Sequence, residues 1–162
     1  MGQYFKAVNL DKREVVCPWC LGGGAKLWEW AANSYGAVFT LLLRRSSATG
    51  GGDYRDPIPP QARRVELGQC AEPAQALLGA IAQAVAAEGQ PLPLSPDSIV
   101  GRWAGDRIIL VGDYDQSKLW DKLPQYRNVT QELVRAWNGF MNLPDRQLTY
   151  NAECSCNQEV AA

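Results

Sequence analysis

The pattern of hydrophobic and polar positions along the chain predicts a mixture of short strands and amphipathic helices. Two strand-like runs, 4–10 and 13–16, flank the turn-forming pair Asp11-Lys12 and predict an N-terminal hairpin. The runs 99–103 and 107–111 predict a second hairpin, with 108–111 buried. Apolar residues recur at helical spacing over 26–45 and over 128–141, which predicts two helices. A short helical turn is expected at 117–122.

Together these elements predict an α+β fold over residues 1–150, in which a small antiparallel sheet of hairpins packs with two or three helices. The segment 46–97 is rich in glycine and proline and is expected to be an insertion with one Ala-rich helix at 73–88. Residues 151–162 form a polar C-terminal tail. Most of the tryptophans fall at core-like spacings and are expected to serve packing: Trp28, Trp30, Trp103, Trp120 and Trp137.

Composition narrows the possible functions. The chain has 162 residues, of which 46% are hydrophobic and 20% charged, and this is typical of a globular protein. The net charge of −1 argues against nonspecific nucleic-acid binding. The sequence contains no histidine, which excludes any mechanism that needs an imidazole base or ligand from this chain. We find neither a signal-peptide pattern nor an apolar run long enough to span a bilayer, and we expect a cytoplasmic protein.

The segment from Cys17 to Gly24, Cys-Pro-Trp-Cys-Leu-Gly-Gly-Gly, is the most informative motif. It resembles a zinc knuckle and also one unit of the cysteine-rich region of DnaJ chaperones. Those chaperones carry several such units, so the resemblance does not extend to chaperone function. A tight turn with two residues between the cysteines brings both thiolates to one metal ion, and a closed zinc site needs four ligands.

The pair Cys154 and Cys156 supplies the other two ligands in our hypothesis, with Cys70 as a spare. The expected metal set is therefore Cys17, Cys20, Cys154 and Cys156, and the expected cofactor is zinc. Lys12, Arg13, Lys26 or backbone amides would offset the negative charge of such a centre. A redox dithiol is disfavoured because the glycines after Cys20 prevent a helix from starting at Cys17. The remaining alternative is that the cysteines carry no chemistry.

Acidic residues at turns offer a different chemistry. Asp53, Asp106 and Asp113 follow or precede glycines, and carboxylates there could bind a divalent cation or act as an acid–base pair. Asp is also common at turns for its backbone hydrogen bonds. The glycines before Lys26 could in the same way hold phosphate at a helix start, although a plain turn explains them better.

Three segments carry a wider resemblance. The first is Met-Gly-Gln-Tyr-Phe-x-x-Val-Asn-Leu-Asp-Lys at positions 1–12, and the second is Gly-x-Lys-Leu-x-Glu at 24–29. The third is Trp-Ala-Gly-Asp-Arg-Ile at 103–108, followed by Gly-Asp-Tyr at 112–114. In these the chain resembles a family of small uncharacterised bacterial and phage-associated proteins. The resemblance implies no activity. We therefore expect a noncatalytic binding or adaptor protein with a protein partner, in a phage or mobile-element context. The alternative is a small metal-dependent hydrolase or phosphate-handling enzyme that uses Asp53, Asp106 and Asp113.

Overall fold

The computed structural model describes residues 2–46, 98–141 and 143–157. By internal contacts the chain divides into Met1–Arg44 with Ser98–Ala162, and Arg45–Asp97. The Ala-rich helix expected at 73–88 and nearly all of the expected insertion lie outside the described residues. No helix in the described part of the chain has the length and apolarity that a membrane crossing requires.

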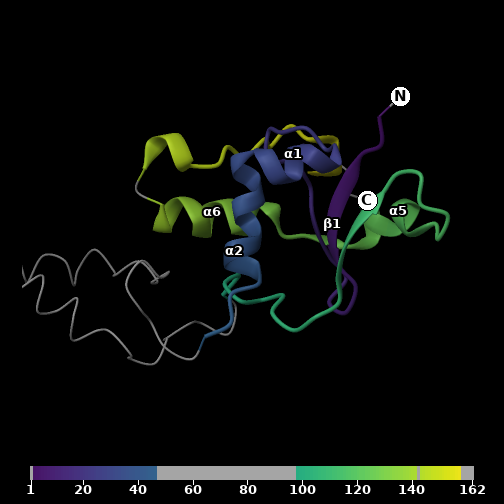
Figure 1. The fold of residues 1–162 in the computed structure, drawn as a ribbon, viewed down its shortest axis with the longest axis horizontal. Coiled ribbons are helices and arrows are strands. Elements are labelled where there is room, and N and C mark those ends of the chain that lie inside the picture. Colours follow the sequence, from purple (N-terminus) through teal and green to yellow (C-terminus); the bar gives the residue numbers. More distant parts are fainter. Residues whose placement is uncertain (1, 47–97, 142, 158–162) are drawn as a thin grey trace, which may run out of the picture. The chain divides into compact units, whose positions relative to one another are not determined.

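A mixed sheet with the strand order β3-β1-β2-β4 lies at the centre of the fold (Figure 1). The strands are β1 (Phe5–Asn9), β2 (Glu14–Val16), β3 (Ile108–Gly112) and β4 (Arg127–Asn128). β1 pairs antiparallel with β2 and with β3, whereas β2 pairs parallel with the short β4. The expected α+β class is thus confirmed, with a sheet that is mostly antiparallel.

The N-terminal hairpin forms as the sequence predicts, and a buried asparagine shapes its turn. The side-chain oxygen of Asn9 accepts hydrogen bonds from the backbone N–H groups of Asp11 and Lys12, at 3.0 and 2.9 Å. Arg13 completes the turn with a φ of 53°. This local bonding returns the chain directly into β2.

The single helix predicted over 26–45 is wrong. The chain instead forms α1 (Leu27–Ala32), the 3₁₀ turn η1 (Ser34–Ala37) and α2 (Val38–Leu42). α1 ends because Asn33 adopts extended backbone angles, φ −98° and ψ 158°. The hydroxyl of Tyr35 donates a 2.7 Å hydrogen bond to the carbonyl of Gly24, which anchors the break to the preceding loop. The apolar residues over 26–45 therefore keep their helical spacing although the backbone changes direction at Asn33.

The second predicted hairpin is also wrong, because among its two runs only β3 is a strand. The segment 99–103 forms turns instead. The backbone N–H groups of Gly101 and Trp103 donate to the carbonyls of Leu41 and Leu42 at the end of α2, at 2.7 and 2.9 Å. These hydrogen bonds leave no donors at these two positions for a strand ladder.

Burial in β3 also departs from the prediction. Ile109 and Leu110 are more than one third exposed, since β3 is an edge strand with a neighbour on one side only. Val111 is buried and joins Val8, Val15 and Leu123 in a core cluster on the sheet. The apolar run from Ile108 therefore reflects an edge strand in which only Val111 buries a large apolar side chain.

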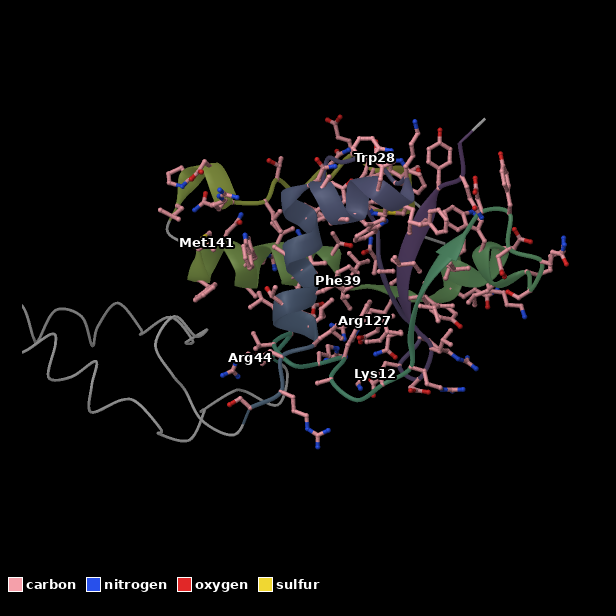
Figure 2. All side chains as sticks on the ribbon, in the orientation of Figure 1. Lys12, Trp28, Phe39, Arg44, Arg127 and Met141 are labelled. Carbon is pink, nitrogen blue, oxygen red and sulfur yellow. The ribbon has the colours of Figure 1, made fainter. Side chains whose placement is uncertain are left out.

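The C-terminal part contributes α5 (Leu119–Lys122), η2 (Leu123–Gln125), α6 (Thr130–Phe140), η3 (Pro144–Arg146) and η4 (Ser155–Asn157). The helix predicted at 128–141 is confirmed as α6, and the expected turn at 117–122 as α5. α6 packs against α2 (Figure 1). The packing role expected for Trp28 is wrong, because its side chain is 62% exposed on α1 (Figure 2).

The segment after α6 folds back onto the domain. The side-chain amide of Asn138 accepts from the backbone N–H of Leu148 and donates to its carbonyl, both at 2.8 Å. Leu148 is buried as a result, and Cys154 further along is buried as well. This return path carries the distal cysteines toward the end of β2.

Candidate metal centre

Four cysteines from opposite ends of the chain meet in one cluster. The Sγ atoms of Cys17, Cys20, Cys154 and Cys156 all lie within 4.8 Å of one another. The distance is 3.9 Å between the sulfurs of Cys17 and Cys154, and 3.0 Å between those of Cys20 and Cys156. Four sulfurs bound tetrahedrally at about 2.3 Å from a zinc ion stand roughly 3.8 Å apart. The cluster therefore has the size to hold one metal ion.

The first pair sits on a tight turn that follows β2. The backbone N–H groups of Leu21 and Gly23 donate to the carbonyl of Pro18, and Gly22 donates to Trp19, each at 3.1 Å. Gly22 has a φ of 67°, which a residue with a side chain adopts only with strain. The Cys-x-x-Cys-x-Gly spacing thus gives the tight turn between the two cysteines that the sequence predicted.

The second pair is brought in by the returning C-terminal segment. The backbone N–H of Asn151 donates a 2.8 Å hydrogen bond to the carbonyl of Cys20, which ties the two segments together next to the sulfurs. The side chain of Asn151 accepts from the N–H of Glu153 at 3.0 Å and forms a turn just before Cys154. η4 then places Cys156 over the first pair.

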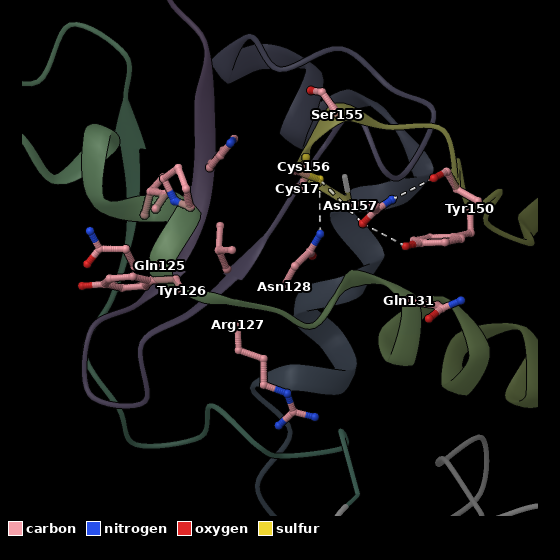
Figure 3. A pocket seen from close by; sticks show the side chains of 15 residues that line it. Cys17, Gln125, Tyr126, Arg127, Asn128, Gln131, Tyr150, Ser155, Cys156 and Asn157 are labelled. Carbon is pink, nitrogen blue, oxygen red and sulfur yellow. Dashed lines mark hydrogen bonds between the residues drawn. The ribbon is translucent and has the colours of Figure 1, made fainter. Parts of the chain in front are cut away.

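A side chain that the sequence analysis treated only as part of a helix start completes the surroundings of the sulfurs. The Nδ2 atom of Asn128 donates to the sulfur of Cys156 at 3.4 Å (Figure 3) and to the sulfur of Cys20 at 3.5 Å. Its Oδ1 atom accepts from the N–H and the hydroxyl of Thr130, which fixes the amide in this orientation. Thr130 in turn accepts from the backbone N–H of Cys17 at 2.9 Å.

Hydrogen bonds and burial shift the pKa values of three of the thiols. A hydrogen bond from Cys20 lowers the pKa of Cys17 to about 5, against its ordinary value of 9.0. The same shared proton, together with burial, raises the pKa of Cys20. Burial raises the pKa of Cys156 to about 12. A metal ion that binds four thiolates replaces these protons.

Positive charge reaches the cluster from β1. The Lys6 ammonium lies 5.3 Å from the ring centroid of Trp19 and 5.0 Å from that of Trp120, and its charge also lowers the pKa of Cys17. Lys12, which the sequence analysis placed near the centre, pairs with Asp106 instead. Lys6 was missed because its sequence position, more than ten residues before the knuckle, gives no local signal.

A pocket of about 870 Å³ opens beside the cluster (Figure 3). Cys17 and Cys156 form part of its wall, and none of the described residues that line it carries a carboxylate. Its other side chains are mainly amides, tyrosines and two cations: Lys6, Gln125, Tyr126, Arg127, Asn128, Gln131, Tyr150 and Asn157. The pocket wall thus combines hydrogen-bonding groups with apolar surface from Val15, Leu123 and Pro124, and the cysteine cluster forms one side of it.

The carboxylates of the alternative enzyme site are not gathered in this way. Asp106 precedes β3, where it pairs with Lys12 and accepts from Asn9 at 2.7 Å. Asp113 follows β3 and accepts from the backbone N–H of Tyr4 at 3.0 Å. The whole of β3 separates them, roughly 13 Å at the usual rise of a strand. Asp53 lies outside the described residues, as does Cys70.

The glycine-rich stretch before α1 also serves the fold. The carboxylate of Glu29 accepts a 2.7 Å hydrogen bond from the backbone N–H of Lys26, so this donor at the helix start already has a partner. α1 spans only six residues. The simpler interpretation of these glycines, a turn into a helix, fits this local structure.

In comparisons of the whole chain, no family model, no curated protein and no solved structure matches it. The resemblance described from the sequence motifs therefore stays a prediction.

Proposed function

We propose that the protein is a noncatalytic binding protein whose fold is stapled by a zinc ion at the Cys17, Cys20, Cys154 and Cys156 centre. The convergence of four sulfurs on one point carries the proposal. Four protein thiolates fill every position of a tetrahedral zinc ion and leave none open for a substrate or a reactive water. Such a closed site is structural.

The chemistry of the donors selects the metal. Thiolate ligands in a tetrahedral arrangement favour zinc or an iron–sulfur site over magnesium or calcium. The two N–H···S hydrogen bonds from Asn128 stabilise deprotonated sulfur. Lys6 offsets part of the net charge of −2 that a zinc ion with four thiolates carries.

The structural role follows from which segments the ion joins. Cys17 and Cys20 belong to the turn after β2, whereas Cys154 and Cys156 belong to the returning C-terminal segment. The second segment has little regular structure of its own beyond short 3₁₀ turns. Metal binding therefore adds to the free energy of folding mainly by holding this segment against the sheet.

Elemental analysis of protein purified without chelator tests the proposal. We expect about one zinc per chain. The double variant Cys17→Ser, Cys20→Ser should lose the metal and melt at a lower temperature, whereas the control Cys70→Ser should keep both. If the protein instead contains iron and shows the visible absorption of iron–thiolate bonds, the metal of the centre is iron rather than zinc. Protein without any bound metal would contradict the proposal.

The pocket beside the centre supports the binding role. Its volume is in the range of ligand sites, and its wall of amides and tyrosines can form hydrogen bonds to a polypeptide. We propose a protein partner. Gln131→Trp should fill the pocket without changing the zinc content. A partner protein that co-purifies with the wild-type protein should no longer co-purify with this variant. Retention by that variant would exclude this pocket, and a catalytic activity abolished by Asp106→Asn or Asp113→Asn would refute the noncatalytic role.

A further inference from the structure

One ligand of the proposed zinc centre is more accessible than the other three. Cys17, Cys20 and Cys154 are at most 7% exposed, whereas Cys156 is only partly buried. Cys156 also forms part of the pocket wall, so a small solute in the pocket can reach its sulfur. Cys17 lines the same pocket but is 1% exposed. The structure thus offers a path to one particular thiolate.

The accessible sulfur has a suitable partner next to it. The Sγ atoms of Cys156 and Cys20 are 3.0 Å apart, and a disulfide needs about 2.05 Å. Cys154 is also close, at 3.3 Å, but only one residue separates it from Cys156, so the ring of a disulfide between them would be strained. Cys20 is therefore the partner that Cys156 can bond with the least movement.

We propose that Cys156 is an oxidation site, at which a hydroperoxide converts Cys156 and Cys20 into a disulfide and releases the metal ion. The inference rests on the proposed zinc centre and concerns the reactivity of that same site. The disulfide joins the same two segments that the metal joins. The two segments are therefore cross-linked in either of two ways, by zinc before oxidation and by the disulfide after it.

The reaction balances with a hydroperoxide as the oxidant. The Cys156 thiolate attacks the terminal peroxide oxygen, the O–O bond breaks, and the leaving hydroxide (an alkoxide from an organic hydroperoxide) takes a proton to become water (or an alcohol). The resulting sulfenic acid is attacked by the Cys20 thiolate, which forms the S–S bond and expels a second hydroxide that is also protonated. Two thiolates lose two electrons and the peroxide gains them. The metal ion, left with only Cys17 and Cys154, dissociates.

The experiment uses full-length protein with Cys70→Ser, so that the fifth cysteine cannot exchange. Hydrogen peroxide is added stepwise, released zinc is followed with a chromophoric chelator, and disulfides are mapped by mass spectrometry. We expect complete zinc release, a Cys20–Cys156 disulfide, and a melting temperature above that of reduced protein treated with chelator. A dithiol reductant with zinc should restore the original state.

A second measurement identifies the residue that reacts first. A sulfenic acid trap added with limiting peroxide should label Cys156 and spare the buried cysteines. Zinc retained in excess peroxide, a disulfide between other cysteines, or labelling of Cys17 or Cys154 would overturn the inference. The zinc content before peroxide tests the proposed function separately, and disulfide mapping on metal-free reduced protein tests the Cys20–Cys156 pairing whatever that content is.

Discussion

Asn128 gives the sharpest test of how the centre is built. Its amide donates to two of the four sulfurs, while its oxygen is held by Thr130. Replacement by leucine, Asn128→Leu, keeps a side chain of similar size but removes both N–H···S hydrogen bonds. We expect the cysteines to remain in place and the affinity for zinc to fall.

The size of the effect follows from the two contacts. Their lengths of 3.4 and 3.5 Å are ordinary for sulfur acceptors, and each is worth on the order of 1 kcal/mol when the acceptor is charged. About 2 kcal/mol corresponds to roughly a 30-fold weaker affinity, within the range for residues that support metal ligands. Asn128→Asp should weaken binding further, because a carboxylate near thiolates adds repulsion.

The affinity is measured by competition with a chromophoric chelator at fixed pH. Gln131→Leu is the matched control, since Gln131 lines the same pocket, yet no hydrogen bond links it to a sulfur among the described contacts. We expect its affinity to equal that of wild type. If Asn128→Leu binds zinc as tightly as Gln131→Leu does, the amide plays no part in holding the centre and the reasoning is refuted.

Two further predictions concern the fold around the centre. Glu14 is 2% exposed and accepts hydrogen bonds from Arg102 and from the indole of Trp103, so Glu14→Ala should lower the free energy of unfolding by about 3 kcal/mol in a denaturant titration. Glu132 forms an exposed ion pair, and Glu132→Ala should lower the free energy of unfolding by less than about 1 kcal/mol. Equal losses in the two variants would contradict the burial argument. A hydrogen bond from Lys12, with a second from Asn9, lowers the pKa of Asp106 below 3.8, so carbon-detected NMR should show its carboxyl titrating below that value, and Lys12→Met should raise it. The pKa of Asp106 is lower in the folded than in the unfolded protein, so the stability that this carboxylate contributes is present above pH 3.8 and is lost as the pH falls through the folded pKa. A measured pKa of 3.8 or above would show that the ion pair with Lys12 does not form.

The parts of the structure that sequence reasoning recovered depend on short-range order. The N-terminal hairpin follows from alternating positions around one turn, and α6 from helical periodicity. The knuckle turn at Cys17 follows from its glycines. The failures share a cause, because periodicity records which residues are apolar but not where the backbone hydrogen bonds go. The predicted helix over 26–45 breaks at Asn33, and the run 99–103 gives backbone donors to the end of α2.

Buried polar residues were missed for a related reason. Glu14 reads locally as an ordinary charged residue next to a turn, yet it is buried because Arg102 and Trp103, far along the chain, bind its carboxylate. Asn128 was expected to start a helix, but it ends β4, and α6 begins two residues later at Thr130, whose N–H donates to the side chain of Asn128. Only the parallel pairing of β4 with β2 places its amide beside the sulfurs.

The sequence by itself determined which chemistry is available: five cysteines in a chain without histidine, two of them in a knuckle spacing and two more near the far end. It also indicated which four cysteines would come together, since the second close pair complements the first. The tertiary structure decided that Cys17 and Cys154, 137 positions apart, lie side by side, that Asn128 and Lys6 face them, and that Cys156 stays open to a pocket. These outcomes depend on how the sheet, α6 and the returning segment pack together, and no local pattern of residues encodes the directions of packed side chains.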